Sequence, residues 1–287
     1  MRRIQITHNT RYEYAEAVTF KLHKLHIRPR EGHDIRIESS QLTIAPDYRI
    51  FWERDIYNNS LALVEFLGKS QTLDITSRVV VQHYGTPPLE FGMDESALLY
   101  PFHYDPLEQV DLIAYQMAVF PRDYPVVQQW LEKIYQPSTL NKTVSLLDTL
   151  NKTIAEEFKY TAREEPGVQS PRQTITLGSG SCRDLAVLFI ESCRALGLAS
   201  RFVSGYLLQP GDGPQDQHGA THAWSEVYLP GSGWWGFDST SGLRVANEHI
   251  AVAHHRHPEA IPPVSGSYVG KPEPHPKMHV SVEVKML

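Results

Sequence analysis

Apolar and polar residues alternate along much of the first 90 positions. Segments that follow this pattern, or that are rich in β-branched and aromatic residues, lie at residues 35–46, 49–68 and 73–85. Such segments are typical of β-strands, and Asn58-Asn59 and Gly68-Lys69 suit the hairpin turns between them. The pattern breaks at Pro87-Pro88, which predicts a linker. We therefore expect a β-rich N-terminal domain at residues 1–90.

Beyond residue 90 the apolar residues recur at spacings of three and four, which predicts amphipathic helices. Prolines punctuate this region, and the expected helices are Pro106–Phe120, Tyr124–Gln136 and Thr143–Phe158. After residue 200 strand patterns return at 201–208, and segments 221–229 and 234–240 predict a hairpin across Pro230–Gly233. Residues 91–287 are therefore expected to form an α+β domain that includes a C-terminal strand.

A further helix is predicted between Gly178 and Gly197, with Cys182 at its start. Its apolar residues form one buried stripe: Leu185, Leu188, Phe189, Cys193 and Leu196. Gly197 is a suitable stop. At the helix start, free backbone N–H groups and the positive end of the helix dipole converge, which favours the nucleophilic thiolate over the thiol. Helices usually begin with a capping Ser, Thr, Asp or Asn, so we interpret Cys182 as a nucleophile that takes the place of a cap.

Composition narrows the class of protein. The 287 residues are 41% hydrophobic and 21% charged, which is ordinary for a globular protein of one or two domains. A net charge of −6 without a basic cluster argues against nucleic acid and against a membrane surface as partners. No apolar run approaches the ~20 residues of a membrane span, and Met1–Tyr14 lacks the apolar core of a signal peptide. With two cysteines and no disulfide framework, we expect a cytoplasmic protein, and the oligomeric state stays open.

Three residue types suited to nucleophilic catalysis follow one another in the second half of the chain. Cys182 needs a base that takes its proton and later protonates the leaving group, and His222 can do both near neutral pH. Asp238 ends the next strand, where it can hold one ring nitrogen of His222 so that the other faces the sulfur. Paired strands lie about 5 Å apart, so side chains on the two arms of the predicted hairpin can come within hydrogen-bonding distance. The sequence therefore predicts a triad of Cys182, His222 and Asp238.

A zinc site built from Cys182, Cys193, His218 and His222 is the alternative from another class of enzyme. Cys193 lies eleven residues beyond Cys182 on the same predicted helix, about 16 Å along its axis. Zinc-bound thiolates lie only ~2.3 Å from the ion, so Cys193 is expected in the core. The histidines of His254–His257 suggest a second metal site, but adjacent residues rarely converge on one ion. We therefore interpret this segment as a polar surface loop. We therefore expect no metal and no other cofactor.

A polar loop rich in glycine and proline, "LLQPGDGPQDQHGATHAW", leads into His222. Loops of this kind are mobile and often border binding sites. We expect this loop to border the substrate cleft and to move more than the strands beside it, with His218 at the rim.

Three sequence blocks resemble those of bacterial transglutaminase-like proteins of the cysteine protease type: "SPRQTITLGSGSC", "GSGSCRDLAVLFIESCRALGLASRFVSGYL" and "THAWSEVYLPGSGWWGFDST". The N-terminal region resembles the domain often found with that core, so the similarity covers nearly the whole chain. It implies an α+β, papain-like core preceded by a β-sandwich-type domain. It also implies thiol-dependent acyl transfer on amide bonds by Cys182, His222 and Asp238. Ser239 stands where a proline is common.

The resemblance leaves open what resolves the acyl-enzyme, since one fold can serve several reactions. We expect water as the default acceptor, and hence hydrolysis of a peptide or isopeptide-like amide in a peptide or protein substrate. Transamidation to an amine, as by a protein-glutamine transglutaminase, and a non-catalytic peptide-binding module are the alternatives. The Cys182 N–H is the expected first oxyanion donor. Trp224, Tyr160 and Gln173 are candidates for the second, with Trp224 otherwise a wall of the site.

Overall fold

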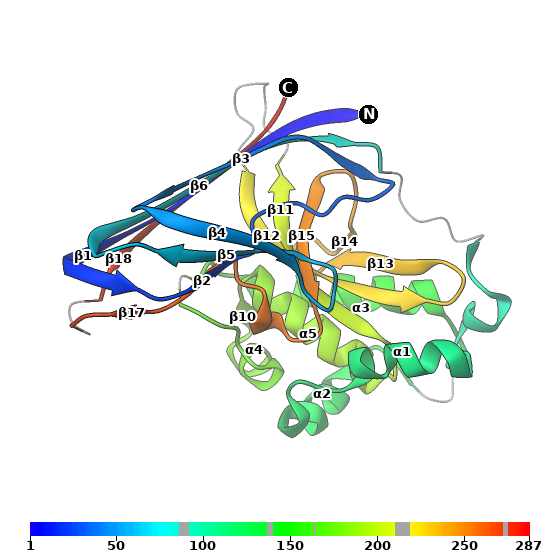
Figure 1. The fold of residues 1–287 in the computed structure, drawn as a ribbon. Helices are drawn as coiled ribbons and strands as arrows, with labels where there is room; N and C mark the ends of the chain where they lie inside the picture. Colours follow the sequence, from blue (N-terminus) through cyan, green and yellow to red (C-terminus); the bar gives the residue numbers. More distant parts are fainter. Residues whose placement is uncertain (86–91, 137–139, 164, 210–218, 272–274) are drawn as a thin grey trace.

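The fold combines two N-terminal β-sheets with a helix-rich core built on a third sheet (Figure 1). The computed structural model describes residues 1–85, 92–136, 140–163, 165–209, 219–271 and 275–287. The α+β class expected from the sequence is therefore confirmed. The linker at Pro87-Pro88 and the loop at 210–218 lie outside the described residues.

The N-terminal region is a pair of antiparallel sheets. The first has the order β17-β1-β6-β3, with β18 also on β1; its strands are β1 (Arg2–Phe20), β3 (Ile35–Ala45), β6 (Ser70–His83), β17 (Tyr268–Val269) and β18 (Lys277–Met286). The second has the order β16-β2-β5-β4, made of β2 (His23–Leu25), β4 (Tyr48–Arg54), β5 (Ser60–Phe66) and β16 (Val264–Ser265). Apolar side chains of both sheets pack into one cluster that includes Phe20, Val64 and Leu73. The β-sandwich-type arrangement follows from that shared core.

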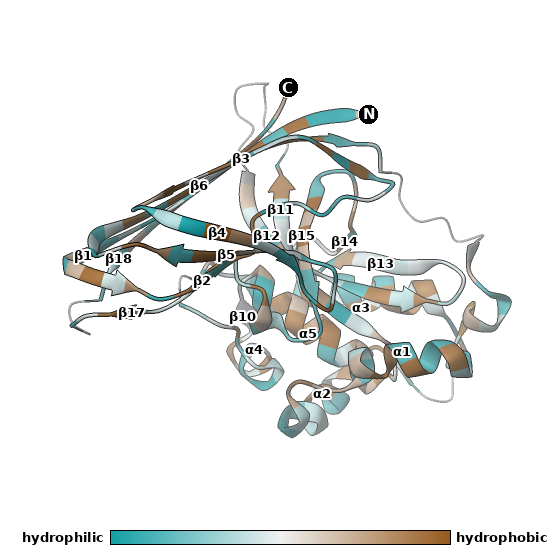
Figure 2. Ribbon diagram, viewed as in Figure 1, coloured by the Kyte–Doolittle hydropathy of each residue, from teal (hydrophilic) through white to brown (hydrophobic). Residues whose placement is uncertain are grey.

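The hydrophobic alternation and the predicted turns explain these sheets. Along β6 buried and more exposed residues alternate, and Figure 2 shows the hydropathy colour changing repeatedly along β1. Asn58 and Gly68 both have left-handed backbones, with φ of 60° and 86°. These angles confirm the turns that the sequence predicts on either side of β5.

Both ends of the chain contribute to the N-terminal sheets. β18 pairs with β1 from Met286 opposite Ile4 to Lys277 opposite Glu13, and the two termini lie near each other (Figure 1). A strand pattern shows that a segment can pair but not with which partner, so the sequence grouped this strand with residues 91–287. The division of the chain near residue 90 stays a prediction.

The helices follow in sequence, and the first three predicted ones are present but end earlier than expected. They are α1 (Pro106–Gln116), α2 (Tyr124–Leu131), α3 (Thr143–Glu157), α4 (Pro171–Leu177) and α5 (Cys182–Ala195). The N–H groups of Val119 and Phe120 donate to the Glu191 carboxylate, so they are not part of a longer α1. Short elements complete the region: η2 (Glu95–Ala97), β7 (Leu99–Tyr100), η3 (Pro121–Asp123), β8 (Asn141–Lys142), β9 (Lys159–Tyr160), β10 (Ser179–Gly180) and η4 (Pro258–Ala260).

The sheet of the core is antiparallel, with the order β14-β13-β12-β11-β15. Its strands are β11 (Ser200–Leu208), β12 (Gly219–Leu229), β13 (Gly233–Asp238), β14 (Leu243–Arg244) and β15 (His249–His255). The β12–β13 pairing confirms the predicted hairpin. The interpretation of His254–His257 as a surface loop is wrong at its start, because His254 is buried on β15. Val252 and Ala253, which precede His254 on β15, are buried as well, so this part of the strand packs inside.

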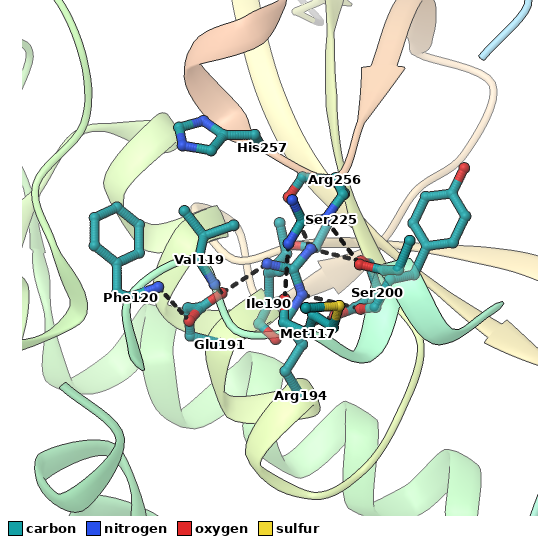
Figure 3. A network of polar contacts seen from close by, with 12 residues as sticks. Met117, Val119, Phe120, Ile190, Glu191, Arg194, Ser200, Ser225, Arg256 and His257 are labelled. Atoms are coloured by element: carbon teal, nitrogen blue, oxygen red, sulfur yellow. Dashed lines mark hydrogen bonds and ion pairs between the residues drawn. The ribbon is translucent and has the colours of Figure 1, made fainter. Parts of the chain in front are cut away.

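Helix α5 lies at the centre of the core. It contacts β11 and β12, and α2, α3 and α4 also pack against it. The residues of the predicted stripe that lie within the helix are buried as expected. Burial also extends to the other faces, because every residue from Asp184 to Arg194 is buried. On another face of the helix, Arg194 lies 2.7 Å from Glu191 and also donates to the carbonyls of Ser200 and Arg256 (Figure 3). Gly197, with φ of 79°, follows the helix as expected.

Candidate active site

Cys182 is the first residue of α5, and Ser181 before it is the N-cap. The Ser181 N–H and hydroxyl each donate to Asp184 Oδ2 at 2.8 Å, and the bond from the N–H is one half of a capping box. The expectation that Cys182 replaces a cap is therefore wrong. The cap and the cysteine occupy neighbouring positions, so the helix start is stabilised and still presents a thiol.

Asp184 fixes this helix start from inside. Its side chain has no exposed surface, and it accepts hydrogen bonds from Arg163 Nε at 2.9 Å and from the Gln169 N–H at 2.7 Å. Burial raises the pKa of Asp184, but these donors together with Ser181 outweigh it and lower the pKa overall. A buried carboxylate thus holds the turn that carries Cys182. Sequence reasoning missed Asp184, although the Ser181–Asp184 spacing is a readable capping signal.

His222 lies between Cys182 and Asp238. It is buried on β12, and its Nε2 lies 3.1 Å from Asp238 Oδ2, off the direction of a linear hydrogen bond. Burial lowers the pKa of His222, but its contacts with Asp238 and with the Cys182 side chain, and the negative charges of both, outweigh it and raise the pKa to about 9. Because Nε2 faces the carboxylate, Nδ1 is left to face the sulfur. The structure brings the three predicted residues together, and their catalytic roles stay a prediction.

Asp238 ends β13 and is held by several donors. Oδ1 accepts from the Thr240 N–H at 2.9 Å, and Oδ2 accepts from Ser241 Oγ at 3.1 Å and from His249 Nε2 at 3.3 Å. Burial raises the pKa of Asp238, but the contacts with His222 and His249 outweigh it and lower the pKa overall. The carboxylate is therefore ionised at neutral pH.

The turn after Asp238 is anchored by α3. Asn151, buried on that helix, donates through Nδ2 to the carbonyls of Asp238 and Leu243, at 3.4 and 3.0 Å. Its Oδ1 accepts from Ser239 Oγ at 2.9 Å. Ser239, which departs from the family pattern, is thus a buried hydrogen-bonding residue. Asn151 carries no signal in the sequence that would have pointed to this role.

The three oxyanion candidates occupy different positions. Tyr160 is half exposed and close to Cys182: burial and the Cys182 charge both raise its pKa. Trp224 has almost no exposed surface, which fits the alternative of a wall. Gln173 caps α4, since its Oε1 accepts from the Ser170 N–H at 2.8 Å. Of the three, Tyr160 is the side chain at the site's solvent side.

Three residues at the site, His222, Asp238 and His249, are close enough to be considered as metal ligands. Ligand atoms of His222, Asp238 and His249 lie within 4.8 Å of one another. However, the Ala246 N–H donates to His249 Nδ1 at 3.4 Å, which leaves the proton of a neutral ring on Nε2, the atom that would have to bind the ion. Cys193 is fully buried in the α5 core cluster, as expected, and His218 lies outside the described residues.

Two surface features lie apart from this site. Cavities of about 340 and 420 Å³ beside the β4–β5 hairpin are both lined by Glu53 and Arg54. Neither lining includes Cys182, His222 or Asp238 among the described residues. None of the described helices combines the length and apolar character that a membrane span requires.

Comparison with known proteins gives matches over nearly the whole chain. The family profile of the bacterial transglutaminase-like N-terminal region matches residues 4–82, and that of the transglutaminase-like superfamily matches residues 129–239. An uncharacterized protein of Mycobacterium tuberculosis is 30% identical over 278 residues, covering 92% of this chain and 87% of the relative. One from Mycobacterium leprae is 23% identical, covering 94% and 95%. A crystal structure from Cytophaga hutchinsonii, described as that of a candidate cysteine protease, shares the fold with a TM-score of 0.73 at 18% identity, over all of this chain and 91% of its own.

Proposed function

The chain belongs to the transglutaminase-like superfamily, and from that premise we propose that it is a cysteine enzyme that transfers acyl groups from amide bonds. Cys182 is the nucleophile, His222 the general base and acid, and Asp238 the residue that orients His222. The observation that carries the proposal is the His222 ring held between a helix-terminal thiol and an ionised carboxylate, with its pKa raised to about 9. This is the arrangement of nucleophile, base and orienter that acyl transfer requires.

The first half of the reaction forms an acyl-enzyme. The Cys182 proton passes to His222 Nδ1, and Sγ attacks the carbonyl carbon of the amide. The oxyanion of the tetrahedral intermediate is placed toward the Cys182 N–H, one of the free donors at the start of α5. His222 then gives its proton to the amide nitrogen, the C–N bond breaks, and a thioester on Cys182 remains.

The second half releases the acyl group. His222 takes a proton from water, the hydroxide attacks the thioester carbon, and the Cys182 thiolate leaves to give a free acid. An amine in place of water gives a new amide by the same proton transfers. We propose hydrolysis of a peptide or protein amide as the main reaction, because water is always present.

The test needs no known substrate at first. Iodoacetamide at pH 6 should label Cys182 and leave the buried Cys193 unlabelled, as read by mass spectrometry of the peptides. His222→Ala should slow the labelling toward that of an ordinary thiol. Equal labelling of both cysteines, or a Cys182 labelling rate that is unchanged in His222→Ala, would overturn the proposal.

Hydrolysis and transamidation are separated by a second experiment. The protein is incubated with a peptide library, with and without a labelled primary amine, and the products are weighed by mass spectrometry. Cys182→Ala is the control in each arm. Cleaved amides support hydrolysis, incorporated amine supports transamidation, and no product with a reactive Cys182 supports a binding module.

A further inference from the structure

A second histidine lies on the carboxylate that orients His222. His249 begins β15, and its Nε2 is 3.3 Å from Asp238 Oδ2, the same oxygen that lies 3.1 Å from His222 Nε2. The two rings come from strands on opposite sides of β11, since Gly205 pairs with His222 on one side and Leu207 with His249 on the other. Two strands therefore direct a histidine at one carboxylate oxygen.

The hydrogen-bond partners of His249 fix the direction of its proton. The Ala246 N–H donates to Nδ1 at 3.4 Å, so a neutral ring carries its hydrogen on Nε2. That hydrogen points to Asp238 with hydrogen-bond geometry, whereas His222 approaches the same oxygen off-line. His249 is thus the better aligned donor of the two.

Packing holds the His249 ring in this position. Its side chain is 8% exposed, and the Trp224 ring meets it edge-on with centroids 5.2 Å apart. Trp224 reaches across β11 because Gly205 has no side chain there: a Cβ would lie 2.6 Å from the indole and 2.3 Å from the Ile250 carbonyl oxygen. The His249 ring therefore packs between the rings of Trp224 and His222.

We propose that His249 is a positioning residue that acts through Asp238. With the Thr240 N–H on Oδ1, and His249 together with Ser241 Oγ on Oδ2, both carboxylate oxygens are held and the carboxylate is kept from rotating away from His222. The His222 ring, which has weaker alignment of its own, is then kept turned with Nδ1 toward Cys182. This inference rests on the proposed triad and adds a fourth residue to it.

The test distinguishes the hydrogen bond that His249 donates from the packing of its ring. His249→Phe keeps a ring against Trp224 but has no donor, whereas His249→Gln loses the ring and keeps an N–H that can reach Asp238. We expect Phe to lower kcat, or the alkylation rate of Cys182 where no substrate is known, by about tenfold with KM little changed, since tenfold corresponds to one lost hydrogen bond. Gln should recover most of that loss. His255→Phe, at the other end of β15, is the matched control and should keep the wild-type rate.

The opposite ranking, Phe active and Gln impaired, would show that His249 only packs and would overturn the proposal. His249→Leu replaces Phe if the latter does not fold by near-UV circular dichroism. A double-mutant cycle gives an independent result: in an Asp238→Ala background, His249→Phe should cause no further loss, and a further tenfold loss would contradict action through Asp238.

Failure of the triad and failure of this inference give different outcomes. If His222→Ala leaves the alkylation of Cys182 unchanged, the proposed function itself is wrong. If His222→Ala slows alkylation while His249→Phe matches wild type, the triad stands and His249 has no positioning role.

Discussion

Each end of α5 has a cysteine close to an acidic residue that pairs with an arginine, yet the two ends differ in exposure and in the origin of that arginine. At the start, Cys182 is partly exposed and Asp184 pairs with Arg163, whose side chain is 19% exposed. Toward the end, Cys193 has no exposed surface and Glu191 pairs with Arg194, which is 1% exposed. One end of the helix opens to solvent, and the other is closed within the core.

The difference teaches that partners, and not residue type, decide what a cysteine can do here. Burial raises the pKa of Cys193 well above its usual range, so this thiol stays protonated and unreactive. Cys182 lies at the helix N-terminus, where the dipole favours negative charge, and His222 is beside it. We therefore expect changes at the start of α5 to affect mainly the reactivity of Cys182, and changes toward its end to affect mainly the free energy of unfolding.

The largest effect is expected for Cys182→Ala. Because no other described nucleophile lies beside His222, amide turnover should fall to background, while the free energy of unfolding changes by less than about 1 kcal/mol at a helix end. Activity assays and urea unfolding measure the two quantities. Retained turnover would show that the nucleophile is a residue other than Cys182.

Arg194→Met should have the largest effect on stability. It leaves the Glu191 carboxylate buried and unpaired, and breaking a buried ion pair costs about 3–5 kcal/mol. The mid-transition in urea should shift accordingly, while the alkylation rate of folded Cys182 is kept. Arg201→Met is the matched control, because the Arg201–Glu226 pair is partly exposed, at 14% and 17%, and should cost less. A loss of Cys182 reactivity in folded Arg194→Met would show that the two ends are coupled.

The protonation state should differ between His222, which lies beside Cys182 at the open end of α5, and His8, which is buried on β1. His222, whose pKa is raised to about 9, should stay charged at pH 8, whereas burial lowers the pKa of His8 to about 4, so its ring is neutral there. NMR titration of labelled histidines measures both midpoints. The stability that His222 contributes is present below pH ~6.5, the unfolded value, and is lost as pH rises through about 9. A His222 midpoint near 6.5 would contradict the contacts with Asp238 and Cys182.

Arg163→Met should disturb the open end with a smaller cost in stability. Asp184 keeps the Gln169 N–H and both Ser181 donors, so the expected loss is about 1–2 kcal/mol. The alkylation of Cys182 should slow, because the turn that carries it is held less firmly. Unchanged alkylation together with a loss above that of Arg194→Met would reverse the assignment of the two ends.

The sequence predicts more of the local structure than of the long-range contacts. The hydrophobic periodicity and the turn residues predict the β-rich start, four of the helices and the hairpin, because those features depend on neighbours along the chain. The pairing of β18 with β1 depends on two segments at opposite ends of the chain. The burial of Glu191 and Arg194 on α5 likewise depends on backbone partners in other segments, which a helical pattern does not contain (Figure 3): N–H groups for Glu191 and carbonyls for Arg194.

The candidate site shows the same limit. Cys182, His222 and Asp238 stand out because their residue types suggest chemistry. Asn151 and His249 act by hydrogen bonds across the fold, and their residue types and spacing give no signal for those contacts. Gln173, a candidate oxyanion donor in the sequence, instead takes part in the capping box at the start of α4.

The smallest expected effect is that of Cys193→Ala, and it completes the comparison. Cys193 packs in the cluster with Leu188, Phe189 and Phe237, so removing its sulfur leaves a small cavity at a cost of about 1 kcal/mol. Alkylation and turnover at Cys182 should keep their wild-type rates, because the two cysteines lie three turns apart on a helix whose ends are held separately. Urea unfolding and iodoacetamide labelling of the same preparation measure both. A change in the alkylation rate of Cys182 without a change in stability would show that Cys193 influences the reactivity of Cys182.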